Sequence, residues 1–126
     1  MKKRLAIRVE MLPKDINAWG SIFGGVIMGH MDVAGGDAAR KYTGENCVTR
    51  AVQRMEFIAP VFVGDMVAFY TRVLRVGLTS ITVYVEVFAE RFNTAGEIKV
   101  AEAEIVYVAI DKQGQPTAIK KEEESG

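Results

Sequence analysis

Apolar residues recur at steps of three and four in one long stretch of the chain, residues 17–42. This spacing puts them on one face of a helix. The residues on that face are Ile27, Met31, Ala34, Ala38 and Tyr42. The pattern predicts a helix of about 18 residues, roughly 27 Å long, that opens at Gly24 and Gly25. Gly44 provides its stop, since glycine adopts the left-handed conformation that commonly ends helices.

Elsewhere apolar and polar residues alternate, which is the period of a half-buried strand. The alternating segments are residues 4–10, 47–57, 66–76, 80–92 and 97–111. Short turns join the last three, whereas residues 58–65 form a longer connector. A sheet with one helix must wrap around that helix to bury its apolar side. We therefore predict the α+β class, with an antiparallel sheet of five to six strands around one long central helix.

The central strands carry more apolar residues than one buried face needs. We place four of them on the outer face of the sheet, where they favour association between subunits. These are Tyr70, Val83, Val85 and Val87.

Length and charge narrow the function classes. At 126 residues the chain reads as a single domain spanning 1–126, with a charged and disordered tail from about residue 115. Lys plus Arg and Asp plus Glu balance at 16 each, so bulk charge favours neither nucleic acid nor a membrane surface. No apolar run approaches the roughly 18 residues of a membrane span. A single cysteine, Cys47, fits a reducing compartment, and we expect a cytoplasmic protein.

Asp32 is the carboxylate on the predicted helix that requires an explanation. Its neighbours on the helix surface are Gly25, Met28, Gly29, Gly35, Gly36 and Ala39, a patch with few side chains. Each glycine inside a helix costs about 1 kcal/mol relative to alanine. We infer that another backbone or a ligand approaches the helix closely at Asp32. The alternative is a solvated aspartate or one that bonds across an interface.

The other reactive side chains give weaker signals. His30 projects away from Asp32, which excludes a His–Asp dyad within this segment, and we expect a surface or interface histidine. Cys47 is most simply a buried structural thiol. No zinc spacing, phosphate-binding loop or dinucleotide fingerprint occurs in the sequence. We expect no metal and no cofactor.

Several segments together resemble hot-dog-fold acyl-CoA thioesterases, specifically the YciA-type and cytosolic acyl-CoA hydrolase branch. They are PKDINAWG at 13–20, IFGGVIM at 22–28, MDVAG at 31–35, VT at 48–49, FIAPV at 57–61, VGD at 63–65, GLTS at 77–80 and AEIVYVA at 103–109. The most specific feature is the combination of Asn17, the Gly24–Gly25 pair and Asp32. The resemblance covers nearly the whole chain apart from its ends.

The resemblance implies hydrolysis of acyl-CoA to a free acid and CoA. Asp32 would be the catalytic carboxylate, as general base or as nucleophile. Asn17, from a loop at the subunit interface, would act with an aspartate of a different subunit. The backbone N–H groups of Gly24 and Gly25 would polarise the thioester carbonyl.

The resemblance also implies where CoA binds and how the chain assembles. Residues matching Gly77, Thr79 and Ser80 lie near CoA in relatives, so we expect these three to contact CoA. CoA is then part of the substrate and not a separate cofactor. The family forms dimers with active sites between subunits, often assembled further into hexamers. We therefore expect a homo-oligomer with a dimer as the minimal active unit, and a trimer of dimers as its full form.

Two further assignments come from residue type. The cations Arg54 and Arg75 could clamp CoA phosphates, although single arginines on strands are more often solvated. Met28, with Trp19, is a candidate for the wall of the acyl tunnel.

Two other functions stay open. A hot-dog hydratase or dehydratase on acyl thioesters would need a histidine opposite the carboxylate, and His30 is the one histidine present. A non-catalytic acyl-CoA-binding module would bind CoA without turnover.

Overall fold

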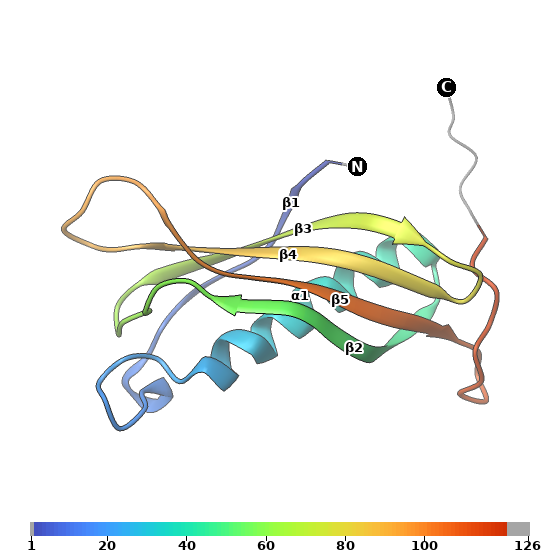
Figure 1. The fold of residues 1–126 in the computed structure, drawn as a ribbon, viewed down its shortest axis with the longest axis horizontal. Coiled ribbons are helices and arrows are strands. Elements are labelled where there is room, and N and C mark those ends of the chain that lie inside the picture. Colours follow the sequence, from blue (N-terminus) through green and yellow to red (C-terminus); the bar gives the residue numbers. More distant parts are fainter. Residues whose placement is uncertain (1, 121–126) are drawn as a thin grey trace.

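Five antiparallel strands form one sheet that lies over a single long helix (Figure 1). The computed structural model describes residues 2–120. Its elements are β1 (Arg4–Glu10), α1 (Gly24–Thr43), β2 (Asn46–Phe57), β3 (Met66–Val76), β4 (Ser80–Glu90) and β5 (Ile98–Ile110), with a 3-10 turn at Pro13–Asp15. The strand order is β1-β3-β4-β5-β2. The predicted α+β arrangement is confirmed, with five strands.

Helix α1 begins and ends where the sequence predicts. Its last turn closes at Gly44, whose φ of 70° is left-handed and whose N–H donates to the Arg40 carbonyl at 2.8 Å. Glycine adopts this conformation without the steric cost that a Cβ brings. On the apolar face, Ile27, Met31 and Ala34 are buried. The helix therefore contributes a continuous stripe to the core beneath the sheet.

The side of β4 that faces the helix differs from our prediction. Val83, Val85 and Val87 have 0% exposure and pack in the core, whereas they were expected on the outer face. Alternation separates the two faces of a strand but does not say which one is buried. Both faces of β4 carry large side chains, and the helix packs against the aliphatic set.

The outer face of the sheet carries aromatic and charged side chains instead. Tyr70 does lie there, as predicted, with its ring edge-on to Phe88 at 5.7 Å between centroids. Lys99 pairs with Glu86 at 3.2 Å and with Glu102 at 2.8 Å. Its hydrogen bonds to Glu102 and to a tyrosine hydroxyl raise the pKa of Lys99.

The segment after β5 is more ordered than expected. Residues 115–120 were predicted to belong to a disordered tail, but Ile119 is buried and its N–H donates to Leu78 O at 2.8 Å. Thr117 N–H donates to Ala109 O at the same distance. An apolar anchor and two backbone bonds outweigh the polar composition of this segment. Residues 121–126 lie outside the described part.

Across residues 2–120, α1 and the short 3-10 turn include no stretch long and apolar enough to cross a bilayer.

Candidate active site

Asp32 lies in the middle of α1, and its carboxylate faces β2. Thr49 Oγ1 on that strand donates a hydrogen bond to Asp32 Oδ1 at 2.6 Å. Thr49 is exposed and Asp32 is half-buried, so the second carboxylate oxygen remains within reach of a ligand or water. Sequence reasoning did not pair these residues, although Thr49 belongs to the VT match with the family. A separation of 17 residues gives no local signal.

The glycines near Asp32 make room for a different group from the one predicted. A Cβ on Gly35 would overlap the Tyr107 hydroxyl, and one on Gly36 would contact the same ring at 3.6 Å. The close approach is thus made by a side chain of β5 rather than by a backbone or a ligand. At Gly29 the glycine face is open, since nothing lies within 4 Å of a Cβ built there, whereas the Phe23 ring covers Gly25.

The helix start offers free backbone donors. Within the described residues, neither Gly24 N–H nor Gly25 N–H has a hydrogen-bond acceptor, whereas Phe23 N–H donates to Asp15 O at 2.8 Å. Unpaired N–H groups and the positive end of the helix dipole coincide here. The Phe57 ring covers Gly24, where a Cβ would meet it at 3.2 Å. Such an end favours negative charge, while the role of the two glycines towards a thioester stays a prediction.

Asn17 organises the loop that leads into the helix. Its Oδ1 accepts hydrogen bonds from Trp19 N–H at 2.8 Å and from Ser21 N–H at 3.2 Å. Its Nδ2 donates to Ser21 Oγ at 3.0 Å. The side chain is half-buried and forms an Asx turn. Asn17 and the Gly24–Gly25 pair therefore share one end of the molecule, while a direct role of Asn17 towards substrate stays a prediction.

An apolar cavity of about 250 Å³ opens beside the helix start. Its lining residues are Ile22, Gly24, Ile27, Phe57, Ala59, Pro60, Val61, Val100 and Ala101. Trp19 and Met28, predicted for an acyl tunnel, do not line it. Trp19 is 90% exposed, and Met28 lies at the helix surface.

The predicted CoA segment lies at the opposite end of the molecule. Ser80 pairs with Val108, next to where β2 begins beside Ile110. Figure 1 shows the β3–β4 turn at the far end of the sheet from the loop before α1. Thr79 O accepts Ala109 N–H at 2.9 Å, and Gly77 N–H donates to Ser80 O at 2.7 Å. One chain does not bring Gly77, Thr79 and Ser80 together with the helix start.

Arg54 and Arg75 meet on the outer face of the sheet. Arg75 Nη2 lies 3.1 Å from one oxygen of Glu104, and Arg54 Nη1 lies 3.5 Å from the other. Arg54 has a positive φ of 52° at an irregular point of β2. The neighbours of Glu104 on β5 point into the core, so this cluster lies across the sheet from Asp32. Within one chain these guanidinium groups are partly neutralised.

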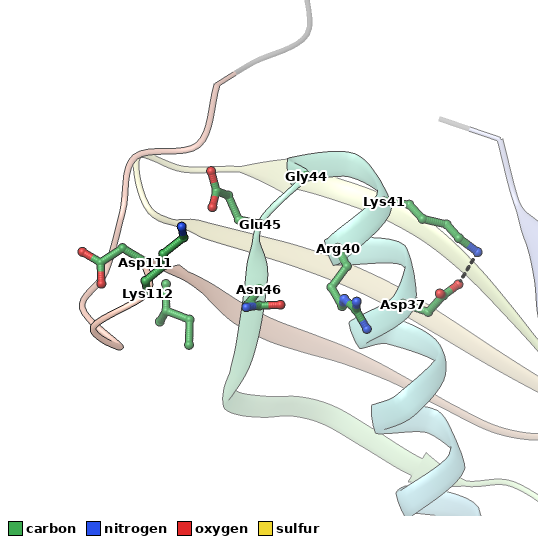
Figure 2. A pocket seen from close by; sticks show the side chains of 9 residues that line it. Asp37, Arg40, Lys41, Gly44, Glu45, Asn46, Asp111 and Lys112 are labelled. Atoms are coloured by element: carbon green, nitrogen blue, oxygen red, sulfur yellow. Dashed lines mark hydrogen bonds and ion pairs between the residues drawn. The ribbon is translucent and has the colours of Figure 1, made fainter.

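A second hollow, of about 440 Å³, lies at the C-terminal end of α1 (Figure 2). Its lining residues are Asp37, Arg40, Lys41, Gly44, Glu45, Asn46, Ile110, Asp111 and Lys112. Charges of both signs surround it, and Lys41 is already paired with Asp37 at 2.8 Å. None of the predicted site residues lines this hollow.

The remaining reactive side chains contact residues other than Asp32. The His30 ring stacks on Phe69 with centroids 5.5 Å apart, and its Nδ1 lies 2.9 Å from Val26 O. His30 is therefore half-buried against β3 rather than a free surface residue. Cys47 is also half-buried and lies 3.5 Å from Thr43 Oγ1. Among residues 2–120, no group of three or more His, Cys, Asp or Glu side chains could hold a metal ion.

Comparison with known proteins agrees with this architecture. The sequence model of the Thioesterase superfamily matches residues 20–95. The acyl-CoA thioester hydrolase YciA of Escherichia coli K12 is 37% identical over 121 residues, which cover 94% of this chain and 92% of that protein. Its name agrees with the enzyme class expected from the sequence.

Two solved structures are similar over almost the whole chain. A hexameric broad-specificity acyl-coenzyme A thioesterase, solved as a mutant, has a TM-score of 0.92 at 36% identity, covering 98% of this chain and 91% of its own. A hexameric hot-dog-fold thioesterase of Campylobacter jejuni has a TM-score of 0.88 at 38% identity, covering 93% and 90%. The resemblance read from the sequence is confirmed: this chain belongs to the thioesterase superfamily, among the hot-dog-fold acyl-CoA thioesterases of the YciA type.

Proposed function

We propose that this protein hydrolyses acyl-CoA thioesters to a carboxylic acid and free CoA, with Asp32 as general base. The observation that carries the proposal is the Asp32 carboxylate held by Thr49 at 2.6 Å in a chain of this family. Thr49 occupies Oδ1 and fixes the plane of the carboxylate. Oδ2 is left to accept a proton from water.

The reaction balances with these groups alone. Water loses a proton to Asp32 as its oxygen adds to the thioester carbonyl carbon, and the carbonyl oxygen becomes an oxyanion. Backbone N–H groups at a helix start stabilise that charge. The intermediate then expels the CoA thiolate, which takes the proton from Asp32 and leaves as the free thiol. The free carboxylic acid is the other product.

Two copies of the chain supply one site in this proposal. Asp32 follows Gly25 by seven positions, and a helix rises 1.5 Å per residue, so the two lie about 10 Å apart along the axis. A general base must lie within about 3 Å of the attacking water, which is too short a reach to span that gap. The Gly24–Gly25 donors and Asn17 therefore act on a thioester whose water is activated by Asp32 of a second copy. The hexameric relatives support assembly of this kind.

The same arrangement suggests where the acyl tail and the CoA part of the substrate bind. The acyl tail enters the apolar cavity beside Gly24 and Phe57, next to the helix-start donors. We retain Gly77, Thr79 and Ser80 as the proposed CoA contacts, contributed by another copy. The carboxylate of Glu104 is paired with Arg54 and with Arg75. These two arginines can therefore bind CoA phosphates only if the phosphates displace Glu104.

The test is release of free thiol from a panel of short to long acyl-CoAs, with wild type and Asp32→Asn compared side by side. Loss of a general base costs about 100-fold to 10,000-fold in rate, while the isosteric amide keeps the fold. Thiol release by wild type and a loss of this size in the variant support the proposal. A variant as fast as wild type overturns the role of Asp32.

The two rival functions give different results in the same assay. A binding module would bind CoA in calorimetry yet release no thiol from any substrate. A hydratase would change the absorbance of an enoyl thioester without releasing thiol. The placement of His30 against Phe69 counts against the hydratase, because the ring is turned away from the carboxylate.

A further inference from the structure

Tyr107 connects the sheet directly to the backbone of Asp32. Its ring is 1% exposed, within the core, and its hydroxyl donates a hydrogen bond to the Asp32 carbonyl oxygen at 2.7 Å. In an α-helix that carbonyl normally accepts the N–H four residues later, here Gly36. A side-chain hydroxyl thus binds the helix backbone at the residue that carries the proposed catalytic carboxylate.

The sequence of α1 is adapted to this contact. A Cβ on Gly35 would overlap the hydroxyl, and its distance to Tyr107 Cζ would be only 3.1 Å. Glycine in a helix costs about 1 kcal/mol against alanine, and Gly36 adds a second such position. The glycines are the condition for seating Tyr107 at this point.

The same pair of strands holds Asp32 a second time. Thr49 on β2 is the register partner of Tyr107 on β5, so the two side chains reach the helix from adjacent positions. Tyr107 bonds the main chain of Asp32, and Thr49 bonds its carboxylate at 2.6 Å. Burial, and secondarily the Asp32 charge, raises the pKa of Tyr107. The hydroxyl therefore keeps its proton and remains a donor at working pH.

We propose that Tyr107 is a positioning residue for hydrolysis: its hydroxyl fixes the helix backbone at Asp32, so that the carboxylate keeps the orientation set by Thr49. This inference rests on the proposed role of Asp32. Tyr107 touches no reacting atom and acts only through that residue. Because the direction of the carboxylate matters in the transition state, the hydroxyl should affect kcat rather than substrate affinity.

The test compares Tyr107→Phe with wild type in steady-state thiol release, at equal concentrations of folded protein. We expect kcat to fall between about tenfold and 100-fold, the range that a misplaced catalytic group produces, with KM within about twofold. Tyr84→Phe is the matched control, since its hydroxyl lies on the outer face and accepts a hydrogen bond from Lys99 at 3.0 Å. It should retain wild-type kcat.

A second pair of variants separates positioning from folding. Gly35→Ala forces the Tyr107 hydroxyl aside, so it should lose both stability and kcat. The double variant Gly35→Ala with Tyr107→Phe relieves the overlap with the hydroxyl. It should regain stability in urea unfolding without regaining kcat. Recovery of both would show a packing role only and would overturn the proposal.

The Asp32→Asn variant, measured in parallel, distinguishes a failure of the positioning role of Tyr107 from a failure of the proposed function. If Asp32→Asn is inactive and Tyr107→Phe keeps wild-type kcat, the positioning role is wrong while the proposed function stands. If Asp32→Asn is as active as wild type, the proposed function itself fails and the positioning role fails with it.

Discussion

The two ends of α1 differ in what is left unsatisfied. At the start, Gly24 and Gly25 present N–H groups without acceptors in the described chain, beside an apolar cavity. At the end, the Gly44 N–H closes the last turn, and Lys41 is paired with Asp37. Charged groups of both signs surround the hollow there (Figure 2). The first end takes part in catalysis in the proposed mechanism, whereas the second is completed by its own chain.

This difference shows how one helix can serve both stability and activity. Capping of the C-terminal end satisfies backbone carbonyls and fixes where α1 stops. The N-terminal end forgoes a capping side chain, since Phe23 at its N-cap makes no such bond. A side-chain cap is worth about 1 kcal/mol, so the missing cap is a cost. Without a capping side chain, backbone N–H groups at this end stay free, and in the proposed mechanism they bind the substrate.

Between the two ends of the helix, the larger effect is expected from removing one donor at the open end. Gly24→Pro deletes an N–H at the first helical position, where proline is well tolerated. We expect kcat to fall about 100-fold to 1,000-fold, as when one oxyanion donor is lost. Gly24→Ala is the control, because it brings the same Cβ towards Phe57 but keeps the N–H. Equal kinetics for the two variants would remove this N–H from the mechanism.

Mixing variants sharpens the same prediction. Co-expressed Asp32→Asn and Gly24→Pro chains should regain activity in mixed oligomers, since one site then combines an intact Asp32 with an intact Gly24 from the other chain. Each variant alone should stay inactive. No recovery in verified mixed oligomers would show that a single chain supplies both groups, against the 10 Å axial separation estimated from helix geometry.

A smaller effect is expected from the closed end. Gly44→Ala places a Cβ on a residue with φ of 70°, which costs about 1–2 kcal/mol of folding free energy. The urea midpoint should fall, and kcat per folded molecule should not change. Gly44→Asn is the matched control, because asparagine tolerates the left-handed region better. A drop in kcat at full folding would mean that this end, too, takes part in activity.

The smallest effect is expected from the surface pair at that end. The Asp37 and Lys41 side chains are 41% and 50% exposed, and such i,i+4 pairs contribute about 0.3–0.5 kcal/mol. A double-mutant cycle with Asp37→Ala and Lys41→Ala in urea unfolding measures the coupling. High salt should weaken it. A coupling above about 1 kcal/mol would show that the hollow in Figure 2 shields the pair from solvent.

Local features of the sequence predicted the boundaries of the fold well. Gly44 marked the end of α1, and alternation located all five strands to within a few residues. These features depend on neighbouring residues alone, so they can be read without tertiary information. The burial of Val83 could not be read in that way. Whether the face of β4 that carries Val83 is buried depends on which side of the sheet the helix packs against. The alternation of residues along the strand is the same in both cases.

The candidate site was predicted only in part. Asp32 and the Gly24–Gly25 pair came from the helix pattern and from the family resemblance. Thr49 and Tyr107 were missed as partners because they lie 17 and 75 residues away in the chain. The glycines near Asp32 did signal a close approach. The sequence could not identify the approaching group as a tyrosine ring.

By itself the sequence determined that one amphipathic helix, opened and closed by glycines, carries Asp32 in a glycine-rich patch and lies under an antiparallel sheet. Periodicity and end residues are local properties, and they survive in any tertiary arrangement. Tertiary structure decided which face of β4 is buried and which side chains hold Asp32. Those outcomes depend on packing between elements distant in the chain, where one registry of β2 with β5 brings Thr49 and Tyr107 to the same turn of α1.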